Sequence, residues 1–305
     1  MKYTDILELH KAAGMPAITI ELTLPRQRDG IILDFDLAVE RAANVADMIS
    51  LTDCPGAKFD CTNILPAYEI KTRLKKNVMF HVTCRDANRR RIMGDVITAA
   101  QHGLENILVI RGDLPKQEQR HLSATVHDYK HSWEIIRDIS NINNGIYFGD
   151  RQGARYDICV GCAVNPTIQN LEVEIANENR LAGKAKAGAQ FAVTQIFFDA
   201  QQYLKCRDMM QAHGINIPLV AGILVLESEG MINFIEKELS GIAVPGSTKD
   251  IFRNKSVERC KELGVGAAKQ IVDELRKIAP GFHIYNGSSK AALELAEYIR
   301  YRAAQ

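Results

Sequence analysis

Strand-like and helix-like segments alternate along the whole chain of 305 residues, and this alternation constrains the fold more than any other feature. Apolar runs rich in β-branched residues predict strands at 17–24, 47–52, 77–84, 106–110, 156–164, 190–198, 217–224 and 281–286. Helical patterns predict helices at 34–46, 66–76, 89–102, 127–141, 171–187, 200–212, 228–239, 257–278 and 289–301. About eight strand-helix pairs favour a (β/α)8 TIM barrel, a single domain over residues 1–305.

The segments outside this alternation complete the prediction. Residues 4–14 form an amphipathic pattern, which predicts a helix that closes the bottom of the barrel. Residues 116–125 and 142–153 are predicted as loops, and no element is assigned to Gly241–Ile251. An open, doubly wound sheet is the alternative fold. It normally carries a glycine-rich turn after its first strand, whereas this chain has Leu22-Thr23-Leu24-Pro25 there.

Charge and hydropathy indicate which partners and which cellular location to expect. The chain has 38 basic and 37 acidic residues, a formal net charge of +1, which argues against nucleic acid as the main partner. The run Arg89-Arg90-Arg91 opens a predicted helix, where a solvated face or a local anion contact is expected. No signal-peptide pattern and no apolar run of roughly 18 residues is present, so the cytosol is the expected location and no membrane span is predicted.

Cysteine usage predicts reduced thiols. The seven cysteines are odd in number and spread through predicted strands and helices, unlike a disulfide framework. Cys159 and Cys162 have the spacing of a metal or redox pair. They lie in an apolar strand without a second pair or nearby histidines, so we expect a buried structural role and no metal.

The fourth predicted strand suggests where the chemistry lies. The apolar run Asn106–Ile110 stops abruptly at Arg111-Gly112-Asp113. Glycine lets a ligand approach the backbone, arginine can hold an anion, and the aspartate can orient a polar ring. Other strands also carry or precede polar residues. A shared concave site accounts for them better than separate buried polar groups do; the residues are Glu21, Thr52, His81, Arg111, Asp113, Asn165, Gln195 and Asn286.

An ordered series of motifs along nearly the whole chain resembles the 5,10-methylenetetrahydrofolate reductase family. The series comprises Ile20-Glu21-Leu22, His81-Val82-Thr83-Cys84-Arg85-Asp86, Asn106 to Pro115, Asn165-Pro166-Thr167, Lys184 to Ala189, Thr194-Gln195-Ile196-Phe197-Phe198-Asp199 and Gly222-Ile223-Leu224. The Asn-Pro variant and the histidine motif resemble the branch also found fused to homocysteine methyltransferases. No such fusion partner is expected among these 305 residues.

The resemblance implies a flavoprotein of one-carbon metabolism and methionine biosynthesis. FAD would carry hydride from NADH or NADPH to methylenetetrahydrofolate, giving methyltetrahydrofolate. Glu21 matches the general acid that helps open the folate's imidazolidine ring to an iminium, a role that needs a carboxyl group still protonated near neutral pH. Asp113 matches the carboxylate near the flavin and pterin, and Gln195 matches the amide that contacts the pterin. These three are the predicted catalytic and folate-binding residues.

The resemblance also assigns the flavin side. Thr52, His81, Arg111, Gly112, Asp113 and Lys184 match flavin-contacting positions, and Tyr129 matches a flavin-side tyrosine across a loop of different length. Several positions depart from the family pattern. Asp53 replaces a frequent tyrosine, Val225 replaces a proline, and Asn177 and Arg180 replace an acid and an asparagine. Ile235 stands where an aromatic residue can stack on the nicotinamide or folate, and the adjacent Phe234 is the substitute predicted to bind substrate.

Three functions remain open from the sequence. The first is the flavin-dependent oxidoreductase, with NAD(P)H or a partner protein as electron donor. The second is a methyltransferase on the same pterin-binding barrel, which passes methyl between tetrahydrofolate and a corrinoid protein. The third is a binding or assembly subunit that needs an electron-transfer partner. Tetrahydrofolate derivatives are the expected ligands in each case, and a homo-oligomer is the expected assembly.

Overall fold

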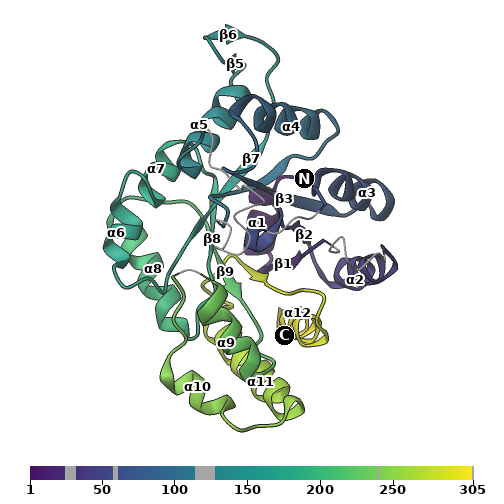
Figure 1. The fold of residues 1–305 in the computed structure, drawn as a ribbon, viewed down its shortest axis with the longest axis vertical. Coiled ribbons are helices and arrows are strands. Elements are labelled where there is room, and N and C mark those ends of the chain that lie inside the picture. The colour runs from purple at the N-terminus through teal and green to yellow at the C-terminus, as the bar shows by residue number, and fades with distance from the viewer. Residues whose placement is uncertain (25–31, 58–60, 114–127, 240, 304–305) are drawn as a thin grey trace.

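Eight parallel strands close into a barrel in the computed structural model, which describes residues 1–24, 32–57, 61–113, 128–239 and 241–303 (Figure 1). Around the barrel the strands follow the order β1-β10-β9-β8-β7-β4-β3-β2, and β2 returns to β1. Their bounds are β1 (Ala17–Leu22), β2 (Met48–Leu51), β3 (Asn77–Thr83), β4 (Asn106–Ile110), β7 (Cys159–Val164), β8 (Phe191–Thr194), β9 (Leu219–Ile223) and β10 (Gly281–Ile284). The predicted TIM barrel and all eight predicted strands are therefore confirmed.

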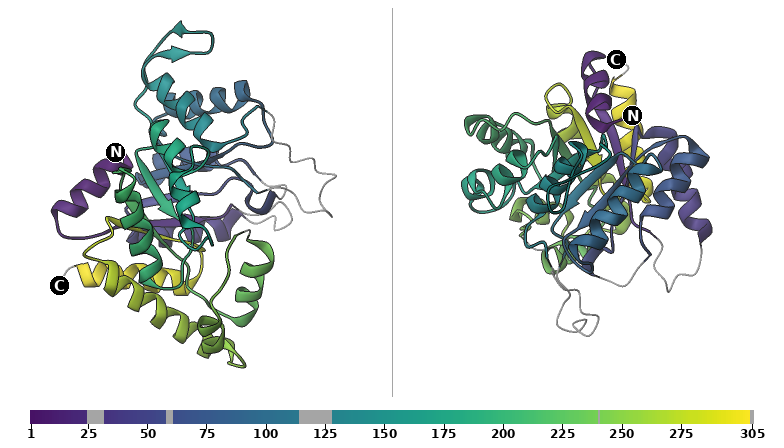
Figure 2. Two further views of the ribbon diagram at one scale, coloured as in Figure 1. Left: turned by 90° about the vertical axis from the view of Figure 1, so that its left-hand side faces the viewer. Right: turned by 90° about the horizontal axis from the view of Figure 1, so that it is seen from above.

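Helices surround the barrel and cover the outer face of the strands (Figures 1 and 2). Their bounds are α2 (Ile32–Val45), α3 (Ile64–Leu74), α4 (Arg89–Gln101), α5 (Ser132–Asn143), α6 (Leu171–Ala176), α7 (Leu181–Lys186), α8 (Ala200–Ala212), α9 (Glu229–Glu238), α10 (Gly246–Phe252), α11 (Val257–Leu275) and α12 (Lys290–Ala303), with a short 3-10 helix η2 (Pro55–Ala57). Polar side chains begin several of them. Asn88, Asp199, Ser228 and Ser256 each accept a backbone N–H of the first turn, which satisfies a donor that the helix leaves unpaired.

The structure corrects the predicted helix at 171–187, which is two short helices, α6 and α7. Asn177 ends α6 with an extended backbone (φ −73°, ψ 131°), and its side chain accepts the N–H of Asn179 at 2.7 Å. Within the predicted loop 142–153 lies a small antiparallel hairpin, β5 (Ile146–Tyr147) and β6 (Arg151–Gln152), which projects from the body (Figure 2). The unassigned stretch 241–251 contains most of α10. The predicted loop 116–125 lies outside the described residues.

Helix α1 (Tyr3–Ala12) closes the bottom of the barrel, as the sequence predicts. Tyr3 is fully buried, and its ring meets that of Phe191 edge-on at 4.8 Å between centroids. The Tyr3 hydroxyl accepts a hydrogen bond from Thr19 Oγ1 at 2.8 Å. Apolar residues of α1 and of seven strands form one core cluster inside the barrel, which is thus a packed interior below its mouth.

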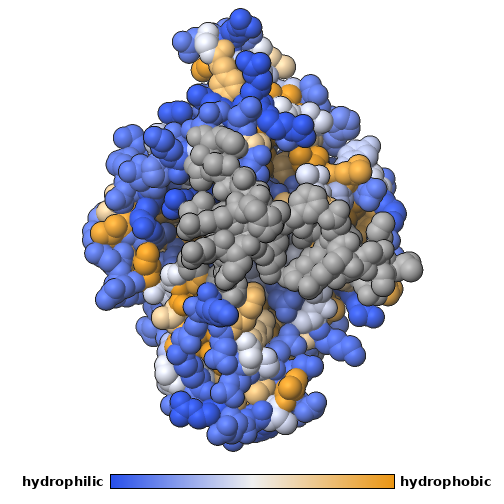
Figure 3. Space-filling model, in the orientation of Figure 1, coloured by the Kyte–Doolittle hydropathy of each residue, from blue (hydrophilic) through white to orange (hydrophobic). Residues whose placement is uncertain are grey.

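The two cysteines of the Cys-x-x-Cys sequence are buried free thiols, as expected. Burial raises the pKa of the Cys162 thiol to about 11, so it is protonated at neutral pH. The described residues contain no group of three or more His, Cys, Asp or Glu side chains placed to hold a metal ion. Across the same residues, no helix has the length and apolar character to cross a bilayer. Hydrophilic residues cover most of the described surface in Figure 3.

Candidate active site

A layer of polar side chains crosses the inside of the barrel above the apolar core. Thr19 on β1 points inward to Tyr3, so Glu21, two residues later, points inward as well. Glu21 Oε2 accepts a hydrogen bond from His283 Nε2 of β10 at 3.1 Å and lies 3.8 Å from His81 Nε2 of β3. His81 Nε2 is also 2.9 Å from Ser50 Oγ of β2. Four adjacent strands thus converge on one carboxyl group.

The charge of Glu21 differs from the sequence-based expectation. Burial by itself raises the pKa of Glu21, as the apolar strand suggests. The hydrogen bond from His283, together with the electrostatic effect of His283 and His81, outweighs burial and lowers the pKa below its ordinary value. In the protein without folate, Glu21 is therefore ionised at neutral pH, which corrects the expectation of a carboxyl group already protonated there.

His81 carries no charge at neutral pH. Its side chain is only 5% exposed, and burial lowers its pKa to about 4, with Glu21 raising it and His283 lowering it further. Among the causes that lower the pKa of Glu21, the hydrogen bond from His283 is the largest.

Asp113 and Gln195 lie at the same end of the barrel as Glu21. Asp113 follows β4, is exposed, and accepts the N–H of Gly56 at 2.9 Å. Gln195 follows β8, is half-buried, and its Oε1 accepts the N–H of Ile196 at 3.0 Å. In the order of the barrel, two strands separate β1 from β8 and two others separate β1 from β4. The three residues are spread around one mouth rather than in mutual contact.

Several of the predicted flavin-side residues also lie at this end of the barrel. Thr52 follows β2, and no described residue pairs with its buried hydroxyl. Arg111 is exposed after β4, and Lys184 reaches from α7 to donate to the carbonyl of Ala163 at 2.7 Å. Gly112 has φ +81°, and a Cβ there would lie 2.8 Å from Arg85 Nε, so the turn requires glycine.

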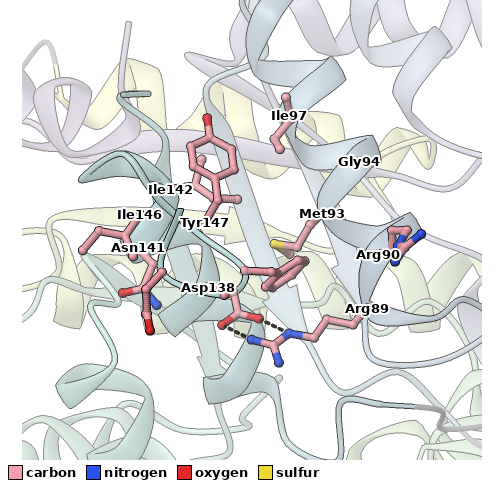
Figure 4. Close-up of a pocket in the computed structure, with 13 residues that line it drawn as sticks. Arg89, Arg90, Met93, Gly94, Ile97, Asp138, Asn141, Ile142, Ile146 and Tyr147 are labelled. Carbon is pink, nitrogen blue, oxygen red and sulfur yellow. Dashed lines mark hydrogen bonds and ion pairs between the residues drawn. The ribbon is translucent and has the colours of Figure 1, made fainter. Parts of the chain in front are cut away.

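Tyr129, also predicted on the flavin side, has a partner within the protein. Its hydroxyl bonds to Asp138 of α5, which also accepts two hydrogen bonds from Arg89 of α4, at 2.7 and 2.9 Å (Figure 4). This cluster borders a cleft of about 450 Å³ between α4, α5 and the β5–β6 hairpin. No predicted site residue lines that cleft. The Tyr129 hydroxyl is therefore engaged with Asp138, and its assignment to the flavin side stays a prediction.

The positions that depart from the family pattern have structural partners. Asp53 accepts a hydrogen bond from Thr83 Oγ1 at 2.8 Å. Buried Arg85 pairs with Asp86 and donates to the carbonyls of Asp53 and Cys54, so it ties the loop after β2 to the end of β3. The carboxylate at residue 53 thus belongs to a network that joins the ends of β2 and β3.

The remaining departures affect α6, α7 and α9. Arg180 pairs with Glu174, whose other oxygen accepts the N–H of Asn165 at 3.3 Å. Asn177 is exposed and caps the turn between α6 and α7. On α9, Phe234 is 50% exposed whereas Ile235 is buried, so the helix presents Phe234 rather than Ile235 to solvent or to a ligand.

Comparison with known proteins agrees with this geometry. The family model for methylenetetrahydrofolate reductase matches residues 6–299. The chain belongs to the methylenetetrahydrofolate reductase family. Among curated members, "Methylenetetrahydrofolate reductase 2" of Schizosaccharomyces pombe is 27% identical over 220 residues, covering 67% of this chain and 32% of that protein. "5,10-methylenetetrahydrofolate reductase" of Pectobacterium carotovorum is 27% identical over 221 residues, covering 71% of this chain and 67% of that protein.

Other relatives extend the comparison. "Methylenetetrahydrofolate reductase 2" of Saccharomyces cerevisiae is 24% identical over 285 residues, 86% of this chain and 45% of that protein. The alignments thus span about a third and under half of the two yeast proteins. A solved structure titled "Uncharacterized protein from Clostridium thermocellum binds two copies of 5-methyl-5,6,7,8-tetrahydrofolic acid" has a TM-score of 0.64 and 14% identity, covering 97% of this chain and 99% of that one. That likeness supports the barrel fold.

Two residues of this family member's polar layer were not predicted from its sequence. His283 lies inside the last strand and is fully buried, and Ser50 lies inside the second strand. The signal was present, since each is a polar residue at an inward position of an apolar strand. Only the pairing of β10 with β1, which joins distant parts of the chain, brings His283 to Glu21.

Proposed function

We propose that this protein is a flavin-dependent oxidoreductase that interconverts 5,10-methylenetetrahydrofolate and 5-methyltetrahydrofolate, with NADH, NADPH or a partner protein as electron donor. The observation that supports it best is the inward carboxyl group of Glu21, held by His283 at 3.1 Å at the mouth of a barrel of this family. Asp113 and Gln195 stand on the surrounding rim. A reduced pterin has ring nitrogens, a lactam edge and a developing cation, and these three side chains offer a complementary partner for each.

Each residue has a distinct role in this proposal. Glu21 takes up a proton once folate excludes water from the mouth, and delivers it to the ring nitrogen released when the imidazolidine ring opens. The negative charge of Asp113 stabilises the cationic iminium, and Gln195 pairs with the pterin edge. Binding and ring opening belong to the protein's own side chains, so they are separable from electron delivery.

The hydrogen-bonding and cationic side chains at the barrel mouth are partly suited to bind a flavin. The buried Thr52 hydroxyl lacks a partner among the described residues, and Arg111 and Lys184 supply cations suited to ring oxygens or phosphates. When bound, FAD would supply hydride transfer between nicotinamide and folate. Thr52, His81, Arg111, Gly112, Asp113 and Lys184 are the residues proposed to hold it.

The deciding experiment is an absorbance spectrum of the purified protein, followed by two half-reactions. We expect a flavin spectrum that bleaches on addition of NADH or NADPH and returns on addition of methylenetetrahydrofolate. Titration with methyltetrahydrofolate should give saturable heat by calorimetry. A protein that binds no folate derivative, with or without added FAD, would contradict the proposal.

A second candidate function rests on the flavin-side departures. Arg180 is neutralised by Glu174, and Tyr129 is bound to Asp138, while Glu21, Asp113 and Gln195 are all retained at the mouth. A folate-binding methyltransferase that passes methyl to or from a corrinoid protein needs the folate side alone. This candidate is favoured if the protein is colourless, gains no flavin when FAD is added, and still binds methyltetrahydrofolate.

A further inference from the structure

Glu21 and His283 form a deeply placed hydrogen-bonded contact at the barrel mouth. The side chain of His283 is 0% exposed, and that of Glu21 is 14% exposed. Their contact joins β1 near the start of the chain to β10 near its end, at 3.1 Å between Nε2 and Oε2. The contact therefore depends on barrel closure and lies where folate is proposed to bind.

The second nitrogen of His283 decides where protons reside in this pair. Nδ1 is buried, and no described residue offers it a partner. A proton on Nδ1 would be a buried donor without an acceptor, which is costly. The favoured tautomer of neutral His283 therefore carries its proton on Nε2 and donates it to the Glu21 carboxylate.

Glu21 can also hold a proton without losing this hydrogen bond. The proton can occupy the second oxygen, Oε1, while Oε2 keeps the hydrogen bond from His283. The geometry thus allows Glu21 to act as the acid and gives His283 the task of holding it.

The other groups around Glu21 are accounted for. His81 faces it from β3 at 3.8 Å and is neutral at neutral pH, and Ser50 of β2 is uncharged. Tyr285 of β10 donates its hydroxyl proton to the carbonyl of Thr194 at 2.8 Å, and burial followed by the charge of Glu21 raises its pKa well above the ordinary value. Of the described residues facing Glu21, His283 is the one that donates a hydrogen bond to its carboxylate.

We propose that His283 is a positioning residue that governs when Glu21 carries a proton, through the hydrogen bond from Nε2. The proposal deepens the proposed function and rests on it for the role of Glu21 as acid. His283 does not itself donate the proton to folate. Ring opening consumes one proton from Glu21 Oε1, which passes to the released ring nitrogen, and Glu21 returns to the carboxylate that His283 holds.

The test compares wild type with His283→Gln and His283→Leu. Glutamine keeps an N–H donor but cannot titrate, whereas leucine removes the donor. Carbon-13 NMR of labelled glutamate carboxyls, with Glu21→Gln to assign the signal, gives the Glu21 titration in the free protein. We expect the proton affinity of Glu21 to rise on the order of tenfold in His283→Leu and by less in His283→Gln. The rate of the folate half-reaction should fall as pH rises. We expect this fall to occur at higher pH in His283→Gln than in wild type, and at higher pH again in His283→Leu.

Thr19→Val is the matched control, because it removes an inward hydroxyl of β1 two residues from Glu21 and should leave the titration unchanged. An identical Glu21 titration in wild type and both His283 variants would overturn the proposal. So would loss of the folate half-reaction in His283→Gln as complete as in Glu21→Gln, since His283 would then be the proton donor. If His283→Leu does not fold, the Glu21 titration is compared between His283→Gln and wild type alone. Identical titrations would again overturn the proposal. Failure of the chain to bind folate would refute the proposed function, whereas the titration of the free protein would still decide the role of His283.

Discussion

The carboxyl group of Glu21 separates two halves of the proposed reaction. In Glu21→Gln the amide oxygen can still accept from His283 Nε2, so the site keeps its shape but loses a titratable proton. We expect reduction of folate to be abolished and oxidation of NAD(P)H by the flavin to be retained, because ring opening belongs to the folate half alone. Stopped-flow measurement of each half-reaction checks this, and equal loss of both would count against the assignment.

Gln195 is predicted to act through binding. Its amide is half-buried at the rim, and a pterin edge paired with it would be left without a partner in Gln195→Ala. The expected cost is about 1–3 kcal/mol of folate affinity, measured by calorimetry with methyltetrahydrofolate. Gln201→Ala, an exposed glutamine on the following helix α8, is the control. Unchanged affinity in Gln195→Ala would refute the contact.

His81 makes the stability of the barrel depend on pH. Its folded pKa is about 4 against an ordinary value of 6.5, so between these values the unfolded chain binds a proton that the folded protein excludes. Stability is therefore expected to fall by roughly 3 kcal/mol as pH drops through this window, and to be independent of His81 above it. Urea unfolding at several pH values measures the loss. His81→Gln should reduce the slope and the exposed His102→Gln should not; equal slopes in all three would contradict the effect.

At the scale of elements, α1 is expected to stabilise the barrel from below. Tyr3→Ala removes a fully buried ring that contacts Phe191 and leaves the Thr19 hydroxyl without its acceptor. Loss of a buried aromatic side chain costs about 3–5 kcal/mol. Urea unfolding should show this loss, with a change under about 0.5 kcal/mol for Leu9→Ala, which is 57% exposed on the same helix. Comparable losses in both variants would argue that α1 is not a plug.

The helices and strands also show which structural features can be predicted from a short stretch of sequence. The apolar runs predicted eight strands because each strand of a parallel barrel is buried on both faces, a property of the run itself. The break at Asn177 and the β5–β6 hairpin were missed because they depend on single turn contacts, such as the 2.7 Å bond from Asn179 N–H to Asn177. Periodicity over a longer window does not contain that information.

At the scale of the whole molecule, long-range pairing set the limit of prediction at the site. The position of Glu21 at a strand end was readable from the sequence, but its charge was not. That charge depends on His283, separated by 262 residues and brought within 3.1 Å by closure of the barrel. Tyr129 shows the opposite case, since its match to a family position gave no sign that Asp138, nine residues later, would bind its hydroxyl.

A second long-range contact ties both ends of the chain to the barrel and gives a test at this scale. Asp47, before β2, accepts the N–H of Ile18 at 2.8 Å and pairs with Arg300 of α12 at 2.9 Å and with His10 of α1 at 3.3 Å. Asp47 is 18% exposed in this contact, so its loss leaves the Ile18 N–H without its acceptor and leaves Arg300 with the Val45 carbonyl alone.

Asp47→Ala is expected to cost about 1–3 kcal/mol, discounted for the partial exposure of Arg300, and to shift a single unfolding transition because β1, β2 and both terminal helices share the carboxylate. Urea unfolding followed by tryptophan fluorescence and by circular dichroism measures the shift and its cooperativity. Asp208→Ala breaks an exposed ion pair with Arg207 at 2.6 Å and should change stability by less than about 1 kcal/mol. Equal effects of the two substitutions, or separate transitions for the two probes in Asp47→Ala, would show that Asp47 does not join the chain ends into one cooperative unit.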